Sequence, residues 1–190
     1  MAKDSQRLEQ EFIATVAQKT GKSLDEWFTV IKSSGLDKSQ AILKWLKEAH
    51  NLNHLQANFL QGLYLNGGQP VFDYDVLFKK LFEDKQALLP TYHALESAIT
   101  QRLPDVELIP TKAYVSIEGK KIFACASPTA KLIRAGLDLG DTPFDDYVQK
   151  AKSLGAMPNL THMIEIAAPS DVNAKFLGFV EQAYNRVHQK

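Results

Sequence analysis

The chain has one cysteine, no excess of charge of either sign and no long apolar run. The single Cys125 excludes an intramolecular disulfide, which fits a reducing compartment. Lysine plus arginine and aspartate plus glutamate both number 22, whereas dedicated nucleic-acid binders usually carry a basic excess. No segment reaches the roughly 18 apolar residues of a transmembrane helix. The N-terminal segment also lacks the apolar core of a signal peptide. We therefore expect a cytoplasmic protein without membrane contact.

The first third of the chain has the apolar spacing of amphipathic helices throughout. Ser23 opens the second expected helix through a capping box, and Asn53 is the expected cap of the fourth. The strongest break in the chain is the Asn-Gly-Gly-Gln-Pro segment at 66–70. We therefore predict an all-helical module over residues 1–66 and a second domain over residues 71–190.

The second part mixes helices with short strands. The expected elements are helices over about 73–82 and 90–103, strands over 106–109, 112–117, 120–126 and 131–139, a short helix over 144–153, a strand over 161–167 and a final helix over 169–188. Tight turns join successive strands, which favours an antiparallel sheet, because parallel neighbours need long crossovers. The predicted fold is α+β, a four-helix module followed by an antiparallel sheet of four to five strands with helices on one face.

Motifs in both parts resemble domains seen in uncharacterised bacterial proteins. In the helical part they are Thr20-Gly21-Lys22-Ser23, Trp27-Phe28, Gly35-Leu36, Trp45-Leu46-Lys47-Glu48 and Leu52-Asn53-His54. In the second part they are KAYVSIEGKKIFACASP at 112–128, KLIRAGLDL at 131–139, Thr161-His162-Met163 and Ala183-Tyr184. The first set resembles a helical domain of unknown function. The second is similar to a domain sometimes labelled a predicted transport protein, and more loosely to YdhG-like and YjbR-like domains.

These resemblances imply an architecture and no assigned reaction. For YjbR-like domains a DNA-binding role has been proposed from shape, so the resemblance implies nucleic acid as an alternative partner. The exposed-looking turn at Lys120 and Lys121 is the local feature that agrees with this alternative.

Alternation along the strands predicts a polar and aromatic face on the sheet. The residues expected on this open face are Tyr114, Lys121, Phe123, Arg134 and His162. Ile122 and Ala124 fall on the opposite, apolar face, which we expect the helices to cover. Cationic groups beside aromatic rings can hold an anion, a planar ring or an unpaired base. The alternative is a solvated face with scattered charges.

The chain shows no catalytic, metal-binding or cofactor-binding motif. Its five histidines are scattered, and Gly67-Gly68 lacks the spacing of a phosphate-binding loop. An enzyme would need His162, Asp138 and either Ser127 or Cys125 to meet within hydrogen-bond reach. In a strand, Cys125 is better explained as a small buried residue. We predict no catalytic residue, no metal and no cofactor.

The predicted function is therefore binding. The expected partner is a small anionic or aromatic ligand, or another protein, held on the open sheet face. The alternative is a nucleic-acid-binding protein that uses the helical module or the hairpin at 117–121. The sequence specifies neither the ligand nor the oligomeric state.

Overall fold

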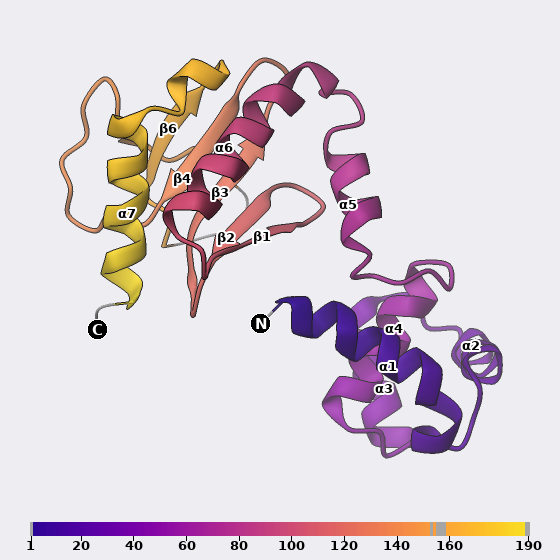
Figure 1. The fold of residues 1–190 in the computed structure, drawn as a ribbon. Helices are drawn as coiled ribbons and strands as arrows, with labels where there is room; N and C mark the ends of the chain where they lie inside the picture. Colours follow the sequence, from indigo (N-terminus) through magenta and orange to yellow (C-terminus); the bar gives the residue numbers. More distant parts are fainter. Residues whose placement is uncertain (1, 153, 155–158, 189–190) are drawn as a thin grey trace. The chain divides into compact units, whose positions relative to one another are not determined.

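The computed structural model describes residues 2–152, 154 and 159–188 (Figure 1). The chain divides into two compact units, Met1–Asp73 and Tyr74–Lys190, just after the 66–70 break. Gly67 and Gly68 have φ angles of 66° and 85°, a left-handed backbone that glycine adopts without steric cost. Each unit is described by itself.

The first unit is all helical. Its helices are α1 (Ala2–Thr20), α2 (Leu24–Ser33), α3 (Ser39–Ala49) and α4 (His54–Leu65). Ser23 caps α2 and Asn53 caps α4, and in both capping boxes the side chain of the third helical residue accepts from the cap's own backbone N–H. The predicted four helices and both caps are confirmed. Their buried residues, which include Trp27, Ile42 and Leu60, form one apolar core.

A buried carboxylate fastens the segment that follows α4. Glu9 of α1 is only 1% exposed. Its Oε1 accepts a hydrogen bond from the backbone N–H of Val71, and its Oε2 accepts one from Phe72, both at 3.0 Å. Residues 71 and 72 lie outside helices and strands, so their amides depend on a side chain for an acceptor. Glu9 thereby holds residues 71 and 72 within the helical unit.

The second unit combines helices with a sheet. Its elements are α5 (Tyr74–Leu81), η1 (Gln86–Leu88), α6 (Leu89–Arg102), β1 (Glu107–Pro110), β2 (Val115–Glu118), β3 (Ile122–Pro128), β4 (Ile133–Leu137), β5 (Gln149–Lys150), β6 (His162–Ile166), η2 (Pro169–Asp171) and α7 (Ala174–His188). No helix among the described residues of either unit is both long and apolar enough to cross a bilayer.

The strands form one sheet in the order β1-β2-β3-β4-β6-β5, and every neighbouring pair is antiparallel. Helices α6 and α7 lie over one face of it (Figure 1). There they share a core with alternate strand residues such as Val115, Ala126, Ile133 and Ile164. The predicted α+β class is confirmed, with six strands in place of four to five.

The segment predicted as a helix over 144–153 is not helical in its described residues, 144–152. The side chain of Asp145 accepts hydrogen bonds from the backbone N–H groups of Tyr147 and Val148, which makes a turn in place of a first helical turn. The chain then pairs with β6 as the short strand β5. The prediction was wrong because this local side-chain turn competes with helix formation. Residue 153 lies outside the described residues.

Candidate functional site

The five predicted site residues do not gather on one face of the sheet. Phe123 is fully buried on the helix side, with its ring 5.4 Å from that of Tyr184 in α7. The β2–β3 ladder pairs Ile117 with Ala124 but Glu118 with Ile122, so Phe123 is an extra residue in a bulge. The bulge resets the alternation and turns Ile122 outward, where it is 42% exposed. The predicted faces of Phe123 and Ile122 were therefore wrong.

His162 and Lys121 also lie away from the predicted cluster. His162 is 1% exposed and shares its side of β6 with Ile164 and Ile166 of the helix-side core. Its Nε2 donates to the carbonyl of Thr142 at 2.8 Å, and its Nδ1 shares a hydrogen bond with the Thr161 hydroxyl at 2.9 Å. This buried ring, with both nitrogens hydrogen-bonded, has a structural role, and the predicted position of His162 on the open face was wrong. Lys121 is exposed in the β2–β3 turn.

Four polar side chains do lie in a row on the face away from α6 and α7. They are Tyr114, Ser127, Arg134 and Glu165. The ladders pair Ser127 with Arg134, and Arg134 with Glu165. Tyr114 precedes Val115, whose partner is Ala126, so Tyr114 follows next in the row. Because neighbouring strands are about 4.8 Å apart, Tyr114 and Arg134 start about 10 Å from each other, within reach of one small ligand. We call these four residues the polar row.

Arg134 is the only cation of the polar row. Its side chain is 23% exposed, and its Nε lies 3.7 Å from Oε1 of Glu165, farther than a hydrogen bond. This Nε is buried and has no hydrogen-bond partner among the described residues. A guanidinium presents five N–H donors in a planar fork, which suits the two oxygens of a carboxylate or phosphate. The unsatisfied Nε therefore marks Arg134 as a candidate anion-binding group.

Two turns at the same end of the sheet each present an exposed lysine near the polar row. In one, Thr111 Oγ1 donates to the carbonyl of Tyr114 at 2.7 Å and accepts from its N–H at 3.1 Å. In the other, Thr129 makes the same pair of bonds to Leu132, at 2.8 and 3.2 Å. The turns present Lys112 and Lys131, which add positive charge at this end.

Part of the helix-free face is covered. Cys125, Leu154, Leu160 and Met163 form a small apolar cluster there, and Tyr114 packs against it. Burial, and secondarily the sulfur of Cys125, raise the pKa of the Tyr114 phenol. Tyr114 is therefore a neutral O–H donor at physiological pH, beside an apolar surface that suits a flat ring.

The structure does not bring together the residues of the enzymatic alternative. Cys125 and Ser127 point to the helix-free face of the sheet, whereas His162 points to the helix side. Asp138 is held by Arg186, whose Nε donates to its Oδ1 at 2.8 Å. Among the residues that the structure describes, no group of three or more metal-ligating side chains is clustered either.

A cleft in the α+β unit was missed by the sequence predictions. It has a volume of about 320 Å³ and lies between α5, α6 and β1. Its lining is Tyr74, Asp75, Phe78, Lys79, Tyr92, His93, Glu96, Leu108 and Pro110. Helical periodicity assigns Tyr92 to the core, where it is indeed buried. The available signal was the spacing of polar and aromatic residues on one side of each helix, at 74, 75, 78 and 79 and at 92, 93 and 96.

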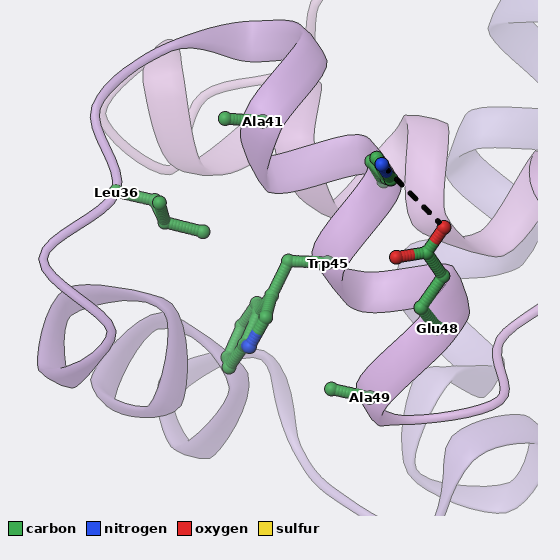
Figure 2. Close-up of a pocket in the computed structure, with 6 residues that line it drawn as sticks. Leu36, Ala41, Trp45, Glu48 and Ala49 are labelled. Atoms are coloured by element: carbon green, nitrogen blue, oxygen red, sulfur yellow. Dashed lines mark ion pairs between the residues drawn. The ribbon is translucent and has the colours of Figure 1, made fainter.

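A groove with a volume of about 480 Å³ lies on the helical unit, and Figure 2 shows the residues that line it. Its apolar lining residues are Leu36, Ala41, Trp45 and Ala49, and its polar ones are Lys44 and Glu48, which form an exposed ion pair at 4.0 Å. Trp45 also contacts the ring of His50 at 4.5 Å. This apolar lining with one exposed ion pair does not distinguish one class of ligand from another.

Comparison with known proteins agrees with the two-part organisation. Residues 9–65 match the family described as Domain of unknown function (DUF4287), and residues 78–186 match Domain of unknown function (DUF5655). No curated protein and no solved structure matches the chain. The resemblance to two uncharacterised domains is thus confirmed. Because the second match spans more than half of the 190 residues, the chain belongs to the DUF5655 family, with a DUF4287 domain matched at its helical end.

Proposed function

We propose that the chain is a non-catalytic binding module that holds a small anionic or aromatic ligand, or an acidic group of a protein partner, on the helix-free sheet face. The observation that carries this proposal is the buried Nε of Arg134, which has no hydrogen-bond partner among the described residues. An anion with two oxygens satisfies this donor and its neighbours on the same guanidinium. The free, buried Cys125 supports a cytoplasmic location as part of the same proposal.

The neighbours of Arg134 support the same class of ligand. Ser127 and Tyr114 supply hydroxyl groups, and the Tyr114 ring supplies an apolar surface beside Cys125. Lys112 and Lys131 strengthen the positive potential at this end of the sheet. Glu165 opposes it, so we expect modest affinity and a preference for ligands that combine an anion with a ring.

Titration with phenyl phosphate, benzoate and neutral benzyl alcohol, followed by calorimetry, tests the proposal. We expect phenyl phosphate to bind best and benzyl alcohol least. Arg134→Lys keeps the charge but loses the planar fork, so it should weaken phenyl phosphate binding by about tenfold. Arg102→Lys is the matched control, because Arg102 already makes two hydrogen bonds to Glu181, at 2.6 and 3.0 Å. Failure of all three probes to bind, or equal loss in both variants, would contradict the proposal.

Nucleic acid is the second candidate, favoured by the exposed Lys120 and Lys121 at the β2–β3 turn. This turn lies at the end of the sheet opposite Lys112 and Lys131, so the two candidates use different residues. A gel-shift measurement with a single-stranded oligonucleotide at about 50 mM salt tests this candidate, because phosphate contacts are strong at low salt. The nucleic-acid candidate would be favoured if the protein retards the oligonucleotide in the gel, if Lys120→Glu/Lys121→Glu abolishes this retardation, and if Arg134→Lys does not.

A further inference from the structure

The cleft between α5, α6 and β1 has aromatic walls set at different angles. The ring of Phe78 lies 5.0 Å from that of Tyr92 and 6.3 Å from that of His93, and Tyr92 and His93 are 5.6 Å apart. The three interplanar angles are 53°, 37° and 70°, so the rings do not form a flat stack. Tyr74 adds a fourth ring to the lining. Tyr92 is buried behind this surface, whereas the partly exposed rings of Phe78 and Tyr74 can present their negative faces to a cation in the cleft.

The carboxylate of Glu96 lies beside these rings. Glu96, whose side chain is 41% exposed, accepts a hydrogen bond from the Tyr92 hydroxyl at 3.2 Å, and its second oxygen lies 3.4 Å from Nδ1 of His93. Burial, and secondarily Glu96, raise the pKa of the Tyr92 phenol, so this hydroxyl stays a neutral donor. The contacts hold the Glu96 carboxylate at the edge of the cleft.

The remaining charges of the lining balance each other. Asp75 and Lys79 are four residues apart on α5, the spacing at which an acid and a base are neighbours on a helix surface. Apart from His93, the charged groups of the lining are the carboxylates of Asp75 and Glu96 and the ammonium of Lys79, a formal net charge of −1. An anion would lie against two carboxylates here, whereas a cation would meet aromatic faces and the partly exposed Glu96 carboxylate.

We propose that this cleft binds a small organic cation, an ammonium group that lies against the partly exposed rings of Phe78 and Tyr74 and beside the Glu96 carboxylate. Leu108 and Pro110 of β1 provide apolar contact for the carbon substituents of the ligand. The site is separate from the polar row in both residues and charge preference. Binding of a cation here and of an anion at Arg134 can therefore succeed or fail independently.

Choline and its neutral isostere 3,3-dimethylbutan-1-ol are the probes, with calorimetry on the full chain as the measurement. We expect choline to bind at least about tenfold more tightly than the alcohol, because the two share a shape but only one is charged. Equal binding would identify a merely apolar cleft and overturn the proposal. Absence of choline binding at millimolar concentrations would overturn it as well.

Two variants locate the binding. Phe78→Leu keeps apolar volume against the core but removes the ring, and Glu96→Gln keeps an acceptor for Tyr92 but removes the charge. Each should weaken choline binding by about fivefold. Glu83→Gln, at an exposed position just after α5, is the control and should bind choline as the native chain does. Equal melting temperatures exclude unfolding as the cause, and loss of binding in neither cleft variant would refute the assignment.

Discussion

Cys125 lies in the middle of β3 with its thiol enclosed on the helix-free face. Its side chain is fully buried among Leu154, Leu160 and Met163. A Cβ on the paired residue Gly136 would lie 2.9 Å from the Cys125 Sγ, so the thiol occupies space that glycine leaves free. Burial raises the pKa of this thiol to about 11, against a smaller opposite effect of its hydrogen bond with the Gly136 backbone. A thiol that stays protonated is a poor nucleophile.

The buried thiol should make folding stability depend on alkaline pH. The folded pKa of about 11 exceeds the ordinary value of 9.0, so the unfolded chain ionises first as the pH rises. The stabilisation is complete below pH 9.0 and is lost toward pH 11. Relative to Cys125→Ala, the free energy of unfolding of the native chain should fall by roughly 2 kcal/mol over this window. Urea titrations at several pH values measure the difference, and a constant difference would contradict the burial argument.

At the scale of elements, α1 is joined to residues 71 and 72 by Glu9. The carboxylate satisfies two backbone amides that no regular element satisfies. The helices of this unit stop at residue 65, so without Glu9 these amides would be partly buried donors without this acceptor. The Glu9 side chain thus fixes the position of residues 71 and 72 within the helical unit.

Glu9→Gln should therefore destabilise the helical unit. An amide group offers one oxygen as acceptor, so either Val71 or Phe72 loses its hydrogen bond, at a cost of about 1–3 kcal/mol. Urea unfolding followed by tryptophan fluorescence is the measurement, because both tryptophans, Trp27 and Trp45, lie in this unit. Glu11→Gln is the matched control on the same helix, since its exposed pair with Lys19 adds little. Equal midpoints for the two variants would show that the contact contributes nothing.

Elements could be predicted from sequence where their signals are local. Ser23 and Asn53 begin their helices through side chains and amides three residues apart, which sequence spacing reveals. The bulge at Phe123 could not be predicted, because it depends on which residue of β2 lies opposite. A single extra residue therefore reversed the predicted faces of Phe123 and Ile122.

At the scale of the whole molecule, the candidate sites depend on contacts between distant segments. Alternation alone placed Tyr114 and Arg134 on the same face, and the ladders join them through Ser127. The cleft instead needs α5, α6 and β1 to meet, and residues 74 and 110 at its two ends are far apart in sequence. Residue patterns within one element cannot predict that these three elements contact one another. The sequence patterns therefore predicted Tyr114 and Arg134 of the polar row and did not predict the cleft.

The two units also have separate apolar cores, and this predicts separate folding. The buried residues of one core come from 12–63 and those of the other from 81–183. A helical unit of this size, rich in contacts between neighbouring helices, folds alone when its core is well packed. We expect a fragment of residues 1–73 to unfold cooperatively, with the same tryptophan-monitored midpoint in urea as the full chain.

Trp27 and Trp45 make this comparison direct, because tryptophan fluorescence of the full chain reports on the helical unit alone. Far-UV circular dichroism of the full chain adds the signal of the α+β unit. If the units fold separately, Glu9→Gln lowers the fluorescence midpoint and leaves the part of the dichroism transition due to residues 74–190 unchanged. If the fragment is unfolded, or if both signals move together in the variant, the cores stabilise each other and the chain folds as one cooperative unit.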